Sequence, residues 1–106
     1  SNESFFSQLR QTPGLIGYNL KELSLLTPTS IHLYNFEFNP LDPGKNLLIQ
    51  GSVYSETVPP EVLLADYVQS ISHSPLYREV VVSRWTKRHL QDGFEIDFAL
   101  SMRGMS

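Results

Sequence analysis

The spacing of apolar residues near the start of the chain predicts a helix over residues 15–26. Its apolar residues step by four, three and three: Ile16, Leu20, Leu23 and Leu26. This spacing places side chains along one face of an α-helix. Pro28 ends the helix, because the residue before a proline is pushed out of the helical conformation.

A second short apolar stripe precedes this helix. Phe5, Phe6 and Leu9 form it, and a break at residues 12–14, Thr-Pro-Gly, follows. We interpret residues 1–14 as the helical stub of a longer upstream segment, since the chain begins with Ser1 rather than methionine. The stripe either pairs with another helix or packs on the domain's own helix, and the sequence leaves both open.

Two strands are predicted next, over residues 31–39 and 47–55. In the first, the apolar positions change phase: Ile31 and Leu33 are odd, whereas Tyr34, Phe36 and Phe38 are even. A β-bulge would produce this change, and so would apolar cover on both faces. The second strand alternates regularly. Gly51 leaves a gap in its side-chain row, which indicates a close approach by backbone or a helix.

The rest of the chain repeats the order of helix, strand and strand. Pro59, Pro60 and Glu61 suit a helix start. The apolar stripe of this helix is Leu64, Tyr67, Val68 and Ile71. Strands follow over residues 79–89 and 94–102, joined by an Asp-Gly turn that is typical of a hairpin.

This order predicts an α+β fold of the ferredoxin-like kind, in the permuted order α-β-β-α-β-β. We expect one domain over residues 15–106, with a four-stranded, mainly antiparallel sheet and two helices on one of its faces. The other face would be partly open, and a partner could bind there.

Composition narrows the function classes. Of 106 residues, 41% are hydrophobic and 18% charged, which is typical of a globular protein. The net charge of −3 argues against a globally basic, nucleic-acid-binding surface. There is no cysteine, which excludes disulfides, thiolate metal sites and a cysteine nucleophile. No apolar run is long enough to span a membrane.

No residue pattern points to catalysis. His32, His73 and His89 lack a partner at metal-ligand spacing, and no nucleophile–base pair or phosphate-binding loop is present. Glu95 and Asp97 share a strand face, but the hairpin register places Arg88 opposite one of them, so we interpret them as ion-pair partners. We predict no catalytic residue, no cofactor and no metal.

One run is both basic and aromatic, over residues 84–89 (Arg-Trp-Thr-Lys-Arg-His). On an open sheet face it could hold single-stranded nucleic acid. The neighbouring acidic strand and the lack of an aromatic ribonucleoprotein motif argue against this, so we predict no nucleic-acid partner. Trp85 is interpreted as a core or interface aromatic.

Several local patterns resemble the periplasmic domain of PilN-type fimbrial assembly proteins and the related inner-membrane platform proteins of type II secretion. The first pattern is the junction of helix and strand at Leu23, Leu26, Pro28, Ile31 and Leu33, and the second is the strand over residues 48–55. The third is the end of the helix and the start of the next strand over residues 71–80, with Ser74, Pro75, Tyr77 and Val80. The fourth is the last strand, with Phe94, Ile96, Phe98 and Leu100. The resemblance covers about residues 15–102.

The resemblance implies a bitopic protein of the bacterial inner membrane whose periplasmic domain is this chain. Its upstream membrane helix would lie outside the sequence. The partner would be a PilO-like protein of similar fold, a second copy, or another component of the platform, and the domain would not be an enzyme. From the residues, the candidate contacts are Phe5, Phe6, Leu9, Tyr34, Phe36 and Phe38. The competing hypothesis is a ferredoxin-like module that senses a small ligand.

Overall fold

The computed structural model describes residues 22–39, 41 and 44–104 of the chain. Residues 22–26 are helical. The elements after them are β1 (Ile31–Phe38), β2 (Leu47–Ser55), α3 (Pro60–Ser72), β3 (Tyr77–His89) and β4 (Phe94–Gly104). The stub predicted over residues 1–14 and the start of the helix predicted over residues 15–26 lie outside the described residues.

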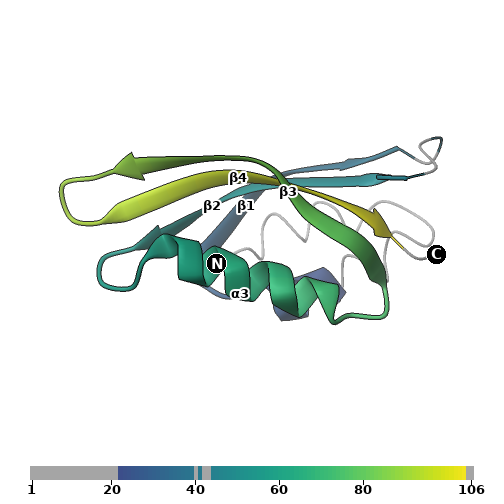
Figure 1. The fold of residues 1–106 in the computed structure, drawn as a ribbon, viewed down its shortest axis with the longest axis horizontal. Helices are drawn as coiled ribbons and strands as arrows, with labels where there is room; N and C mark the ends of the chain where they lie inside the picture. Colours follow the sequence, from purple (N-terminus) through teal and green to yellow (C-terminus); the bar gives the residue numbers. More distant parts are fainter. Residues whose placement is uncertain (1–21, 40, 42–43, 105–106) are drawn as a thin grey trace.

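The strands form one antiparallel sheet in the order β1-β2-β4-β3 (Figure 1). The hairpins β1–β2 and β3–β4 lie side by side, and α3 carries the chain from β2 to the far edge. The predicted α+β class, four-stranded antiparallel sheet and helices are therefore confirmed. Within the described residues, no helix is both long and apolar enough to cross a membrane.

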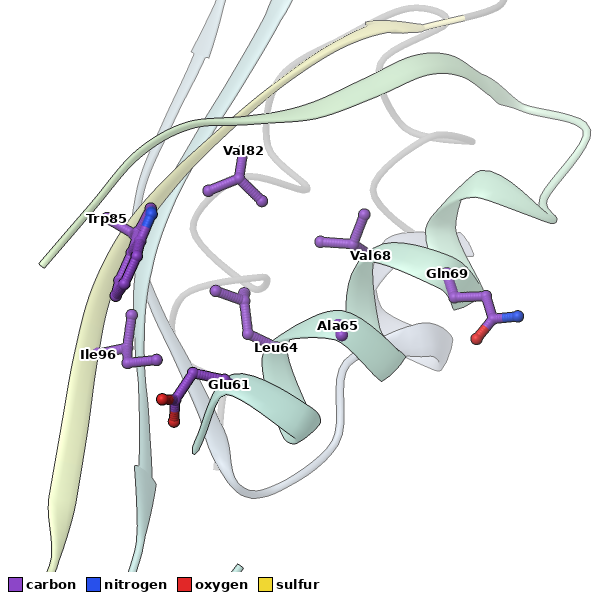
Figure 2. Close-up of a pocket in the computed structure, with 8 residues that line it drawn as sticks. All are labelled: Glu61, Leu64, Ala65, Val68, Gln69, Val82, Trp85 and Ile96. Atoms are coloured by element: carbon purple, nitrogen blue, oxygen red, sulfur yellow. The ribbon is translucent and has the colours of Figure 1, made fainter. Parts of the chain in front are cut away.

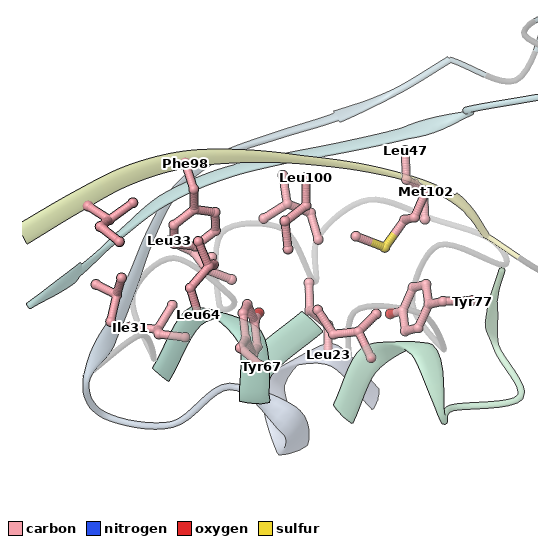
Figure 3. Packing of buried hydrophobic residues seen from close by; sticks show 14 residues of the cluster. Leu23, Ile31, Leu33, Leu47, Leu64, Tyr67, Tyr77, Phe98, Leu100 and Met102 are labelled. Atoms are coloured by element: carbon pink, nitrogen blue, oxygen red, sulfur yellow. The ribbon is translucent and has the colours of Figure 1, made fainter. Parts of the chain in front are cut away.

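The hydrophobic core lies between α3 and one face of the sheet (Figure 3). From α3 it takes Leu64, Tyr67 and Ile71, which follow the predicted helical spacing. From β4 it takes Ile96, Phe98, Leu100 and Met102, one face of the predicted alternating strand. Leu23 of the first helical segment is completely buried in the same cluster. Each fully buried side chain of this size contributes roughly 1.5–3 kcal/mol relative to exposure.

β1 contains a bulge, one of the two explanations that its phase change allowed. The pairing with β2 shifts between Leu33 and Asn35, so Tyr34 has no partner in the register. Beyond the bulge, Phe36 lies opposite Ile49 and Phe38 opposite Leu47. Residues directly opposite each other share a sheet face, so both phenylalanines lie on the core side.

Gly51 lies where the sequence predicts a close approach. A Cβ atom built there would lie 2.5 Å from the His32 carbonyl oxygen and 3.0 Å from Cζ of Phe98. The Phe98 ring occupies the space left by the absent side chain, on the strand beside it.

β3 is longer and less regular than the sequence predicts. It begins at Tyr77 rather than Glu79, because the buried Tyr77 side chain joins the core and its backbone lies opposite Gly104. The register with β4 shifts twice, between Arg78 and Val81 and between Val82 and Arg84. Glu79 has a positive φ of 54°. The regular part of β3 therefore runs from residue 84 to residue 89.

Candidate functional site

A groove runs between α3 and β3 on the helix-covered side of the sheet (Figure 2). Its volume is about 470 Å³. Its apolar walls are Leu64, Ala65 and Val68 from α3, Val82 and Trp85 from β3, and Ile96 from β4. Glu61 and Gln69 of α3 add the polar part of the lining.

The strand register explains why this groove is apolar. Val82 lies opposite Leu100, and Trp85 lies opposite Phe98. Both β3 residues therefore share the face that forms the core. Nevertheless Trp85 is 56% exposed and Val82 is 38% exposed. Among the described strands, β3 lies at the sheet edge and has a neighbouring strand, β4, on one side only. The groove is thus an uncovered continuation of the core.

One end of the groove is crossed by an ion pair. Nζ of Lys87 lies 2.9 Å from Oε2 of Glu61 and joins β3 to the first turn of α3. The hydrogen bond from Lys87 lowers the pKa of the Glu61 carboxyl below its usual value. Nζ of Lys87 also lies 4.8 Å from the centre of the Phe94 ring, on which His89 stacks. Exposed pairs of this kind stabilise little, so their main effect is to set the position of the Lys87 side chain.

The opposite side of β3 is polar and basic. Arg88 forms ion pairs with Glu95, directly opposite it, and with Asp97 at 2.9 Å. This confirms the predicted interpretation of the two carboxylates. Arg84 is exposed and takes no part in the ion pairs among the described residues.

A similar surplus of positive charge lies further along the same face. Arg78 is directly opposite Arg103, and both are exposed. Like charges in this arrangement repel each other. Neither arginine belongs to an ion pair in the described part of the chain. This end of β3 and β4 therefore carries two exposed positive charges that no described ion pair neutralises.

The alternation of β3 divides the basic and aromatic run at residues 84–89. Trp85 and Lys87 lie opposite the core residues Phe98 and Ile96, on the α3 side. Arg84 and Arg88 lie on the other side. The run does not form a single face on which a base could stack while arginines hold its phosphate. The absence of a nucleic-acid partner stays a prediction.

Only three of the predicted interface residues lie in the described part of the chain, and their surroundings differ. Phe5, Phe6 and Leu9 lie outside the described residues. Tyr34 is 57% exposed at the bulge of β1, whereas Phe36 packs against the core and Phe38 is 39% exposed at the end of the same strand. Partner contact by these six residues stays a prediction.

The histidines lie apart from one another. His32 is exposed on β1, His73 caps the C-terminus of α3, and His89 stacks on Phe94. Among the described residues, no three histidine or carboxylate side chains are grouped closely enough to hold a metal ion. The groove could not be predicted from the sequence, because periodicity does not show the two register shifts in β3 that decide which residues share the face of Trp85.

Comparisons of the chain with protein-family models, with curated proteins and with solved structures gave no significant match.

Proposed function

We propose that this domain is a non-catalytic assembly module that acts by protein–protein contact. In this proposal it is the periplasmic part of a PilN-like protein in the inner-membrane platform of a type IV pilus or type II secretion machine. Its partner is a PilO-like protein of similar fold or a second copy.

The order of the elements supports this proposal. Moving the first strand of a ferredoxin-like β-α-β-β-α-β chain to its end gives α-β-β-α-β-β. The sheet order that results from this permutation is the order β1-β2-β4-β3 found here. Leu23 and Leu64 belong to one core cluster, which favours placing both helices on the same sheet face. We therefore propose the permuted ferredoxin-like fold that the resemblance implies.

The observation that carries the interaction function is the exposed groove. Trp85 and Val82 face the core side of the sheet and yet remain open to solvent. A large apolar surface of this kind marks interaction sites in soluble domains. Tryptophan is also among the residues that most often dominate binding energy at protein interfaces.

The test is co-purification of the protein with the products of the neighbouring genes, among which we expect a PilO-like protein. We expect Trp85→Ala to weaken the complex by roughly tenfold or more, as hot-spot tryptophans do. The matched control is Leu25→Ala, a residue that is 75% exposed and does not line the groove. Equal binding by wild type and Trp85→Ala would remove the groove from the interface.

The membrane-platform part has its own test, the coding sequence upstream of Ser1. A single apolar segment of about 20 residues followed by a heptad-patterned helix is expected. A start codon immediately upstream, or a soluble catalytic domain there, would overturn the assignment to an inner-membrane platform.

The candidate contacts on β1 need different variants. Phe36→Ala removes a side chain that packs against the core, so lost binding would not be separable from lost stability. Tyr34→Ala is the cleaner change because Tyr34 is exposed at the bulge. Unchanged partner binding by a folded Tyr34→Ala variant would exclude Tyr34 from the interface.

A small-ligand module is the second candidate, and the same groove favours it. Its volume of about 470 Å³ lies within the range of ligand pockets, and its walls are apolar. A screen of metabolites by thermal unfolding tests this function. A ligand that raises the melting temperature of wild type but not of Trp85→Ala would support it.

A further inference from the structure

No strand among the described residues pairs with the outer edge of β3. Leu90 N donates to Gly93 O across the turn, so residues 90 and 93 form a hydrogen-bonded pair. In an antiparallel ladder such pairs alternate with non-hydrogen-bonded ones. Arg88 and Thr86 therefore bond to β4, whereas the N–H and C=O groups of Lys87 and Trp85 point away from the sheet. Trp85 and Lys87 are exposed, and β3 is the last strand of the sheet among the described residues, so no described strand takes up these groups.

Side chains on the two sides of this edge differ in chemistry. On the α3 side, Trp85 and Val82 open the apolar groove. On the other side, exposed Arg84 takes part in no described ion pair. β3 as a whole holds four of the eight lysines and arginines of a chain whose net charge is −3. Positive charge is thus concentrated on this strand.

We propose that the edge of β3 from Arg84 to His89 binds an extended acidic segment of a partner protein as a fifth strand of the sheet. Side chains of an added strand point alternately to the two faces. An occupant with alternating apolar and acidic residues places its apolar side chains in the groove beside Trp85. It places its carboxylates on the opposite face, beside Arg84. This inference rests on the proposed function as a protein-interaction module and names the chemistry of the partner.

A second copy fits this edge poorly. Its own β3 would bring the same four basic residues against those of the first copy. Its β1 carries a single carboxylate, Glu37. The register shifts on either side of Val82 also make the edge of β3 irregular there. Bulges in edge strands hinder pairing with another chain in the same way. Binding is therefore expected over the regular stretch of residues 84–89.

The first experiment uses the 106-residue chain and a fluorescein-labelled eight-residue peptide of alternating valine and glutamate. In the first control peptide, lysine replaces glutamate. The second control, the separated-block peptide, has the same composition but carries all its valines before its glutamates. Fluorescence anisotropy should show binding of the alternating acidic peptide alone, weakened by salt. Arg84→Glu should weaken it by about two- to fivefold, the range of one exposed charge pair. Equal binding of the separated-block peptide would overturn the proposal.

The second experiment reads the backbone directly by amide hydrogen exchange. In the free chain the amides of Thr86 and Arg88 should be protected and those of Trp85 and Lys87 unprotected. The acidic peptide should protect Trp85 and Lys87 as well. Binding that leaves these two amides unprotected would show groove binding without strand addition and would overturn the proposal.

A proline variant isolates the outward hydrogen bond. Lys87→Pro removes an N–H that faces solvent, which an edge strand tolerates. Lys87→Gln is the matched control, because both variants lose the ion pair to Glu61. We expect Lys87→Pro to abolish peptide binding and Lys87→Gln to retain it. The melting temperatures of both variants establish that they fold, and the exchange pattern of wild type decides the question if Lys87→Pro does not.

The outcomes separate this inference from the proposed function. Loss of the PilO-like partner in Trp85→Ala, with full binding by Lys87→Pro, would keep the interaction function and overturn strand addition. Self-association of the chain that protects the Trp85 and Lys87 amides without peptide would identify a second copy as the occupant and overturn the acidic-segment proposal.

Discussion

A partly buried chain of hydrogen bonds joins α3 to the first helical segment and gives the sharpest stability prediction. Oγ1 of Thr27 donates to the Leu23 carbonyl oxygen at 2.7 Å and lies 2.7 Å from Oη of Tyr67. A threonine hydroxyl has one hydrogen, and Leu23 takes it. Tyr67 must therefore be the donor to Thr27, and its side chain is only 2% exposed.

The direction of this chain makes the two single substitutions unequal. Tyr67→Phe removes the donor but leaves Thr27 bonded to Leu23, so it should cost about 0.5–1.5 kcal/mol. Thr27→Val leaves the buried Tyr67 hydroxyl without its acceptor and also removes the bond to Leu23. Stranding a buried donor costs about 1–3 kcal/mol, so Thr27→Val should be the more destabilising change.

The double variant tests the same reasoning without relying on absolute values. When Tyr67→Phe is already present, Thr27→Val no longer leaves a buried hydroxyl without an acceptor. The double variant should therefore lose less unfolding free energy than the sum of the losses of the two single variants. Urea unfolding of the four proteins measures the difference, and 1 kcal/mol corresponds to about 4–8 °C in melting temperature for a domain near this size. Costs that add to within about 0.3 kcal/mol, or a Tyr67→Phe change costlier than Thr27→Val, would refute the donor assignment.

Three further predictions concern packing and pH. Gly51→Ala should destabilise the domain by about 1–3 kcal/mol in urea unfolding, because the new Cβ would lie 2.5 Å from a backbone oxygen that cannot rotate away; an unchanged midpoint would contradict this contact. Burial raises the pKa of Tyr67 and Tyr77, so their contribution to stability is present below about pH 10 and is lost at higher pH. Tyrosinate absorbance of these two residues should therefore rise together with the loss of the circular dichroism signal, and ionisation with the fold intact would contradict their burial. Lys87→Met should raise the pKa of Glu61 back toward its ordinary value in a carboxyl NMR titration. The lowered pKa of Glu61 stabilises the fold at pH values above the pKa of the unfolded state, and this contribution is lost as the pH falls through the lower pKa of the folded state. The stability of the variant should therefore change less on acidification.

The sequence by itself predicted the four strands, α3 and the β3–β4 hairpin. The period-two pattern of β4 and the helical spacing of α3 each identify the buried face, because burial of one side of an element imposes that period. The Asp-Gly turn limits the register of the β3–β4 hairpin, and this is why a pairing of Arg88 with either Glu95 or Asp97 was predictable; the structure places Glu95 opposite Arg88. The close approach at Gly51 was predictable because a missing side chain in a regular strand leaves a space that a neighbouring group fills.

Only the tertiary structure decided which residues remain exposed beside the core. The bulge in β1 moves Phe36 and Phe38 to the core side. The phase change in the sequence allowed either a bulge or apolar cover on both faces, and only the pairing with β2 decided between them. The groove at Trp85 depends on how far α3 extends across β3. β3 lies at the edge of the sheet, and β4 separates it from β2. Periodicity records which face of an element is apolar. Whether another element covers that face depends on contacts between segments far apart in the chain, and these exist only in the folded protein.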